Sequence, residues 1–143
     1  MIVYAESSAV LSWLLGEIHC ETIHRSMETS EFVVTSDLTL IECDRVLHRA
    51  ASLDELSAER VSACRRALYR AAETWIVLRI SGAIVERARG PFPEEPIRSL
   101  DALHLASVLD TVALIPETSL LTLDERVRRC GLALGIRVLP ELL

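Results

Sequence analysis

The stretch Ile2-Val3-Tyr4-Ala5-Glu6-Ser7-Ser8-Ala9-Val10 changes over a short span from a strand pattern to a helix pattern. Isoleucine, valine and tyrosine favour a buried strand. A hydroxyl at Ser7 or Ser8 can cap the following helix by accepting a hydrogen bond from a free backbone N–H. Glu6 is therefore expected where a strand ends and a helix begins. We expect this strand near the middle of a parallel sheet, whose carboxyl edge is where ligands bind.

The length and composition predict a single domain over residues 1–143. With 143 residues, the chain can bury a core without disulfides or metals. No apolar run approaches the ~20 residues that span a bilayer, and the N-terminus lacks a signal-peptide pattern, so no membrane association is expected. The four cysteines form no C-x-x-C pair, so we expect free thiols and a cytoplasmic location.

The charge balance is acidic, with a formal net charge of −6, and all 15 basic residues are arginines. This balance argues against a broad basic surface for nucleic acid. It does not exclude an enzyme that acts on nucleic acid through a bound metal. The absence of lysine argues against phosphoacceptor receivers, which need one, and the absence of a glycine-rich phosphate loop argues against nucleotide-binding switches.

Strand and helix patterns alternate along the whole chain. Strands are predicted at 2–5, 32–35, 75–78, 119–122 and 136–139, and helices at 9–15, 18–27, 38–47, 58–72, 81–89, 100–109 and 124–134. This order predicts an α/β fold with a parallel sheet of four to five strands flanked by helices. Because the helices at 38–47 and 58–72 have no strand between them, we also expect a protruding helical hairpin.

Four acidic residues occupy similar places, following a strand or near the start of a helix: Glu6, Glu42, Asp101 and Asp124. In a parallel sheet all four can converge at one edge. Carboxylates a few Å apart repel one another and persist by taking up protons or by binding a hard cation. Mg²⁺ and Mn²⁺ prefer such oxygen ligands. The alternative is that the acids are solvated and only stabilise helix ends.

The segments around these acids resemble the PIN-domain family, in particular the VapC-type toxins of bacterial toxin–antitoxin pairs. The segments are 3–9, 39–47, 98–106 and 121–127. The third is the most specific, because it contains the run Leu100-Asp101-Ala102-Leu103-His104-Leu105-Ala106. The resemblance extends over essentially the whole chain and implies a PIN-like fold.

The resemblance implies an Mg²⁺- or Mn²⁺-dependent endoribonuclease in which a metal-activated water hydrolyses RNA phosphodiesters. The four acids would be both its catalytic residues and its metal ligands, and Ser8 and Thr122 match hydroxyl residues that support them. The family also implies a homodimer, an RNA substrate and a cognate antitoxin that covers the site.

One residue departs from the family pattern, in which the first acid is usually aspartate. Glu6 has an additional methylene, and Mg²⁺ demands near-ideal geometry. The alternative function is therefore a catalytically impaired PIN-like protein that binds an antitoxin or RNA without efficient cleavage. Two further residues have open roles: Arg98 can bind a phosphate, and His104 is either a general base or a structural helix residue.

Overall fold

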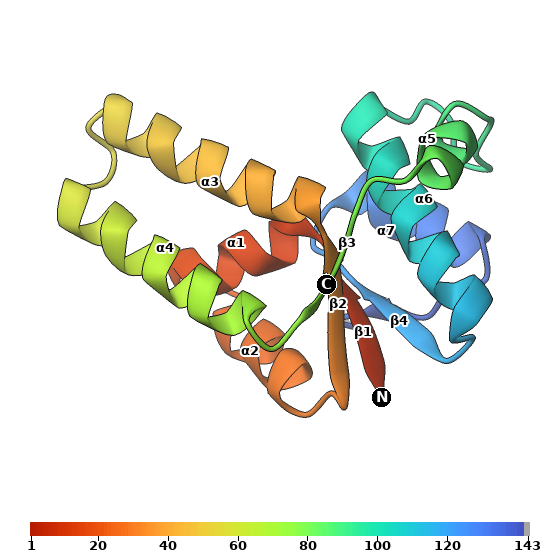
Figure 1. The fold of residues 1–143 in the computed structure, drawn as a ribbon, viewed down its shortest axis with the longest axis horizontal. Helices are drawn as coiled ribbons and strands as arrows, with labels where there is room; N and C mark the ends of the chain where they lie inside the picture. Colours follow the sequence, from red (N-terminus) through yellow and green to blue (C-terminus); the bar gives the residue numbers. More distant parts are fainter. Residues whose placement is uncertain (142–143) are drawn as a thin grey trace.

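The computed structural model describes residues 1–141 and shows a five-stranded parallel sheet between layers of helices (Figure 1). The strands are β1 (Ile2–Ala5), β2 (Phe32–Ser36), β3 (Ile76–Leu78), β4 (Thr118–Leu121) and β5 (Val138–Leu139). Their order across the sheet is β3-β2-β1-β4-β5, with every neighbouring pair parallel. The predicted parallel sheet and the central place of the first strand are confirmed.

Different helices cover the two faces of the sheet. The helices are α1 (Ser7–Leu15), α2 (Cys20–Glu28), α3 (Asp37–Ser52), α4 (Ala58–Ala72), α5 (Gly82–Ala88), α6 (Ser99–Leu114) and α7 (Glu125–Ala133). Helices α1 and α2 pack on one face together with parts of α3 and α4, and α6 and α7 pack on the other (Figure 1). Within residues 1–141, no helix has the length and apolar character needed to cross a membrane.

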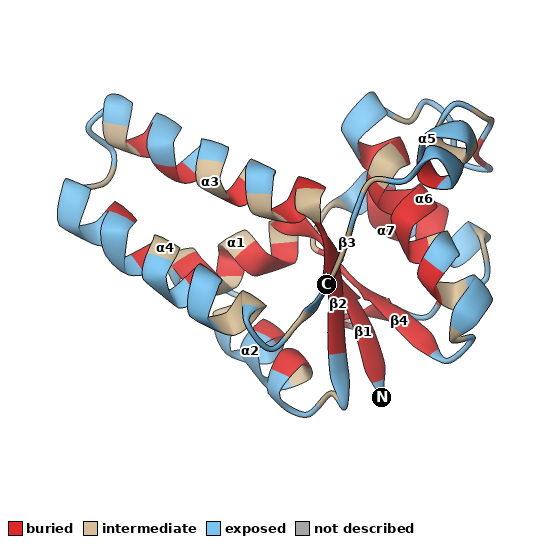
Figure 2. Ribbon diagram, in the orientation of Figure 1, coloured by how far each residue is buried: buried red, intermediate tan, exposed pale blue. Residues whose placement is uncertain are grey.

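The central strand β1 contributes to both cores. Val3 and Ala5 face the cluster that includes α1 and α2, whereas Ile2 and Tyr4 face the cluster that includes α6 and α7. All four side chains are buried, and Figure 2 shows β1 and β4 as buried strands with helices on either side that carry exposed residues. Burial on both faces is the usual condition of a parallel sheet, and it explains why this strand is apolar without alternation.

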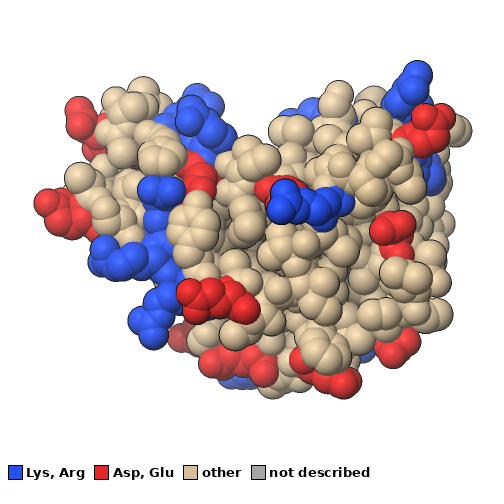
Figure 3. All heavy atoms as spheres, viewed as in Figure 1, with Lys and Arg blue, Asp and Glu red and all other residues tan. Residues whose placement is uncertain are grey.

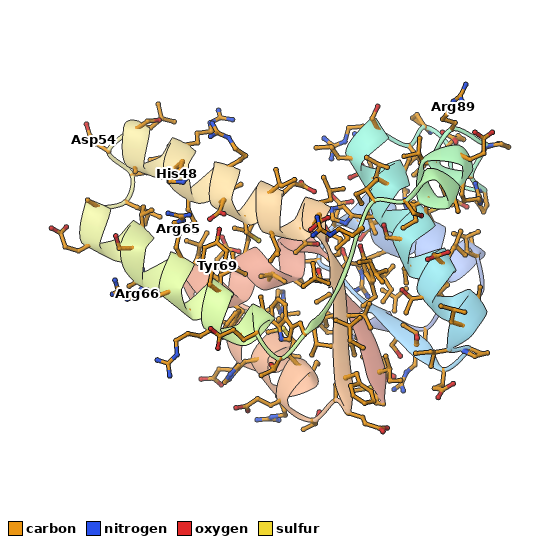
Figure 4. All side chains as sticks on the ribbon, viewed as in Figure 1. His48, Asp54, Arg65, Arg66, Tyr69 and Arg89 are labelled. Carbon is orange, nitrogen blue, oxygen red and sulfur yellow. The ribbon has the colours of Figure 1, made fainter. Side chains whose placement is uncertain are left out.

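Helices α3 and α4 form the predicted hairpin, which extends away from the sheet (Figure 1). Leu47 and Val61 belong to a small apolar cluster between them. Asp44 on α3 accepts a hydrogen bond from Arg65 Nε at 2.9 Å and another from the Tyr69 hydroxyl, both on α4 (Figure 4). These contacts join the two helices to each other.

Several element boundaries differ from the sequence-based expectation: α1 begins at Ser7 instead of residue 9, α3 continues to Ser52 instead of ending at residue 47, and α6 and β5 differ as well. Helix α6 continues to Leu114 instead of ending at residue 109, and the buried polar residue Thr111 is accommodated in it because its hydroxyl bonds the carbonyl of Ser107 at 3.0 Å. Strand β5 is shortened to Val138–Leu139, since only these residues pair with β4. None of these changes moves the carboxyl edge of the sheet.

Candidate active site at the carboxyl edge of the sheet

The four acids approach the carboxyl edge of the sheet from four different elements. Glu6 directly follows β1, Asp124 lies between β4 and α7, Glu42 lies in the second turn of α3, and Asp101 lies in the first turn of α6. Contacts through intervening side chains connect all four. Figure 3 shows a recess in this part of the surface, between the hairpin and the helices α5 and α6.

The carboxylate of Glu6 is buried and bonded by both oxygens, with the residue 4% exposed. Its Oε2 accepts hydrogen bonds from the Thr122 hydroxyl at 2.7 Å, from the Ser8 backbone N–H at 3.1 Å and from the Ser8 hydroxyl. Its Oε1 accepts from the Ser7 hydroxyl at 2.6 Å. Glu6 itself therefore caps α1, and the expectation of a serine cap at Ser7 or Ser8 is wrong, because both serines already lie in the helix.

Ser8 and Thr122 also bond to the segment that carries Asp124. The backbone N–H of Asp124 lies 3.1 Å from Ser8 Oγ and 3.2 Å from Thr122 Oγ1. The Asp124 carboxylate caps α7, because its Oδ1 accepts from the backbone N–H groups of Arg126 at 2.9 Å and Val127 at 3.0 Å. The two predicted supporting hydroxyls thus connect Glu6 to Asp124, and one Asp124 oxygen stabilises a helix end.

Arg98 lies between Asp101 and Asp124. Its Nε is 3.1 Å from Asp101 Oδ2, and its Nη2 is 3.8 Å from Asp124 Oδ2. The hydrogen bond to Asp101 and the negative charge of the same group raise the pKa of Arg98 above its ordinary value. Asp101 is 8% exposed, whereas the Arg98 side chain is 65% exposed. The residue expected to bind a phosphate therefore pairs with two of the acids here.

His104 lies between Glu42 and Glu6. Its Nε2 is 2.5 Å from Glu42 Oε1 and 3.6 Å from Glu6 Oε1. Sequence reasoning singled out His104 but did not pair it with Glu42, which lies far away in the chain. The sequence offered one indication of a role for His104: it is a polar residue among the apolar residues of α6, one turn after Asp101.

The negative charge of this cluster affects neighbouring groups. Burial raises the pKa of Tyr4 to about 12, and the charges of Glu6 and Glu42 contribute in the same direction. Burial also raises the pKa of the Cys43 thiol, again with contributions from Glu6 and Glu42. Burial thus keeps both groups neutral, and the nearby carboxylates act in the same direction.

The donor set has the chemistry that a hard divalent cation requires, because it offers carboxylate and hydroxyl oxygens and no thiol. In the arrangement described, Asp101 and Asp124 share Arg98, while Glu6 and Glu42 share His104. Within residues 1–141, no three His, Cys, Asp or Glu side chains are arranged so that they could hold a metal ion together. The residues therefore fit a metal in their chemistry, while the exposed Arg98 side chain pairs with two of the acids.

Comparison with known proteins shows which family this chain resembles. The family model described as PIN domain matches residues 3–131. A relative named Ribonuclease VapC35, from Mycobacterium tuberculosis, is 27% identical over 139 residues, covering 96% of this chain and 95% of the relative.

Two solved structures have the same fold. The crystal structure of Mycobacterium tuberculosis VapC20, described as a Sarcin-Ricin loop cleaving toxin, matches with a TM-score of 0.64 and 18% identity over 90% of this chain and 95% of that one. A toxin-antitoxin complex from Klebsiella pneumoniae matches with a TM-score of 0.58 and 18% identity over 85% of this chain and 86% of that one. At this level of identity the two structures establish a shared fold.

Proposed function

Because this chain belongs to the PIN-domain family, we propose that it is an Mg²⁺- or Mn²⁺-dependent endoribonuclease and the toxin of a toxin–antitoxin pair. The observation that supports the proposal most directly is the cluster of four acids, which side chains from distant segments join at one edge of the sheet. In this proposal residues 1–143 form one PIN domain, and the same four acids hold the cation and serve catalysis.

The chemistry of the proposed reaction divides between the cation and the chain. Glu6, Glu42, Asp101 and Asp124 would hold the cation, which would supply activation of water and stabilisation of the leaving oxygen of an RNA phosphodiester. The chain keeps the ligands in place: Ser8 and Thr122 hold Glu6, and the two backbone N–H groups at the start of α7 hold Asp124. The guanidinium of Arg98, which lies beside Asp101 and Asp124 and is largely exposed, would be the group of this chain within reach of an RNA phosphate at the site.

The partners of this protein are proposed from its relatives. One relative is named a ribonuclease, one structural neighbour is described as a toxin that cleaves the Sarcin-Ricin loop, and another is a toxin-antitoxin complex. These descriptions support RNA as the substrate class and an antitoxin as the protein partner. We also propose a homodimer and, since the substrate is RNA, action in the cytoplasm.

Cleavage of RNA by the purified protein tests this function. We expect cleavage with Mg²⁺ or Mn²⁺, loss of cleavage with EDTA, and a loss of at least about 100-fold in Asp101→Asn, because one proposed ligand loses its charge. The matched control is Asp110→Asn, which makes the same change at an exposed position of α6. Cleavage that survives EDTA, or equal activity in the two variants, contradicts the proposal.

The alternative is a protein with the same fold and an impaired centre. The observation that favours it is Glu6, whose longer side chain takes the place of the usual aspartate and whose two oxygens already accept hydrogen bonds. The variant Glu6→Asp distinguishes the two functions. If Glu6→Asp gains metal-dependent cleavage that the natural protein lacks, the impaired-centre function is correct.

A further inference from the structure

His104 is a buried polar residue whose ring lies between two of the proposed metal ligands. The residue is 1% exposed and comes from α6. Its Nε2 lies 2.5 Å from Glu42 Oε1, 3.4 Å from Ser7 Oγ and 3.6 Å from Glu6 Oε1. The shortest of these contacts is a hydrogen bond to Glu42, and it connects α6 to the hairpin helix α3.

The contacts of the ring fix its orientation. A carboxylate can only accept, so the hydrogen bond to Glu42 requires a proton on Nε2. On the opposite side of the ring, Nδ1 faces the Tyr4 hydroxyl at 3.5 Å, and that hydroxyl bonds Ser36 Oγ at 3.1 Å. A continuous polar contact path therefore runs from β2 through β1 and α6 to Glu42. Because every group before Glu42 is buried, the ring has little freedom to turn.

Glu42 differs from the other three acids in how it is held. Thr122 and Ser8 bond Glu6, Arg98 bonds Asp101, and backbone N–H groups bond Asp124. Among residues 1–141, His104 is the one hydrogen-bond partner of the Glu42 side chain, which is 26% exposed. A glutamate that lost this partner would be free to turn toward solvent.

We propose that His104 is a positioning residue that holds the carboxylate of Glu42 among the other acids, so that Glu42 can act as a metal ligand. The inference rests on the function proposed above. It assigns His104 no contact with RNA and no proton transfer. In this proposal it acts through Glu42, whose Oε1 lies 2.5 Å from Nε2, and not through Glu6, whose Oε1 lies 3.6 Å away. This makes the proposal separable from a general packing role in the core.

Substitutions at His104 separate positioning from packing. The variant His104→Phe keeps a ring of similar size and removes the donor, while His104→Gln keeps an N–H donor. We expect His104→Phe to weaken Mn²⁺ binding about 10- to 100-fold, as measured by calorimetry, and His104→Gln to restore most of the affinity. The matched control is His48→Phe, which changes an exposed histidine farther along α3 (Figure 4) and is expected to bind Mn²⁺ like the wild type.

A double-mutant cycle tests whether His104 acts through Glu42. In a Glu42→Ala background, His104→Phe is expected to cause no further loss of Mn²⁺ affinity, because the positioned group is already gone. An equal loss in both backgrounds overturns the proposal and assigns His104 a general structural role. Full Mn²⁺ affinity in a folded His104→Phe variant also overturns it.

The metal-free protein provides a second measurement, which is independent of the proposed function. We expect the NMR spectrum of the His104 ring to show a proton on Nε2 that is protected from exchange, and its resonance to shift in Glu42→Ala. An unprotonated Nε2, or a resonance that Glu42→Ala does not move, overturns the positioning role. Wild-type protein that binds no Mn²⁺ overturns the proposed function instead, and the ring spectrum then decides the role of His104.

Discussion

The guanidinium of Arg98 lies 3.1 Å from Asp101 and 3.8 Å from Asp124, and 65% of its side chain is exposed. It supplies positive charge at a place where a cation would meet the same two carboxylates. Because Asp101 is buried, Arg98 leaves this pair at little cost only if another cation takes its place. Under the proposed function, Arg98 and a divalent ion are therefore alternatives for these two acids.

We expect Arg98→Gln to bind Mn²⁺ more tightly than the wild type, by roughly fivefold, because the neutral amide no longer repels or replaces the cation. Calorimetric titration of the two proteins measures the difference. The control is Arg89→Gln, which makes the same change at an exposed arginine directly after α5 (Figure 4). Weaker Mn²⁺ binding in Arg98→Gln would contradict the idea that Arg98 and the metal compete for Asp101 and Asp124.

Tyr4 makes the stability of the protein depend on pH in the alkaline range. Its pKa is raised from 10.0 to about 12 in the folded protein, chiefly by burial. Between these two values the unfolded chain binds fewer protons than the folded one, so stability falls as pH rises. The contribution is fully present below pH 10, and roughly 2–3 kcal/mol is lost across this window.

Urea unfolding at a series of pH values measures this loss, and Tyr4→Phe is the informative variant. It is expected to lose less stability than the wild type between about pH 10 and 12, because it has no phenol to ionise. Cys43, whose pKa is also raised by burial, leaves a residual dependence of the same sign. Equal slopes in the two proteins would contradict the role assigned to Tyr4.

At the scale of single residues, the positions of the acids could be predicted from the sequence more accurately than the side chains that contact them. Glu6 and Asp124 could be placed because each follows a strand pattern directly, and parallel strands end at a common edge. The contact between His104 and Glu42 could not be predicted, because it depends on how α6 packs beside α3 and no local pattern encodes that.

The ends of β4 and β5 are joined by a buried arginine of α7. Arg128 is 8% exposed, and its guanidinium donates to the carbonyls of Thr122 at 3.0 Å, Leu139 at 3.2 Å and Pro140 at 2.7 Å. Burial lowers the pKa of this arginine. Because Thr122 also bonds Glu6, the same arginine supports the segment that holds the site.

We expect Arg128→Met to destabilise the protein by about 2–4 kcal/mol, because buried carbonyls lose their hydrogen-bond donors. Arg129→Met is the matched control, since Arg129 is exposed on the same helix, and it is expected to unfold like the wild type. Urea unfolding of both variants measures the difference. A loss of equal size in the two variants would contradict the structural role of Arg128.

At the scale of elements, strand and helix order could be predicted because short apolar runs rich in strand-forming residues alternate with longer helical stretches. Boundaries were less accurate where a polar residue is buried, as at Thr111 in α6, or where pairing limits a strand, as in β5. The role of Arg128 escaped prediction because it lies in an arginine-rich helix, and its acceptors come from separate parts of the chain.

For the whole molecule, the net charge of −6 and the gathering of acids at one edge imply unfavourable repulsion that a bound cation would relieve. We expect Mn²⁺ to raise the melting temperature by several degrees, because a ligand at 100 times its Kd adds about 2.7 kcal/mol of stability. Asp101→Asn is expected to respond much less, and Asp110→Asn to respond like the wild type. Thermal unfolding with and without Mn²⁺ measures all three, and an equal response in Asp101→Asn would contradict a metal at the four acids.

The central position of β1 also has a consequence for synthesis on the ribosome. β2 follows β1 closely in the chain, whereas the other neighbour of β1, β4, is synthesised only after α3, α4, β3, α5 and α6. Thr122, whose hydroxyl bonds Glu6, directly follows β4. Under the proposed function, we therefore expect a nascent chain to be inactive on RNA until β4 and Thr122 have been synthesised.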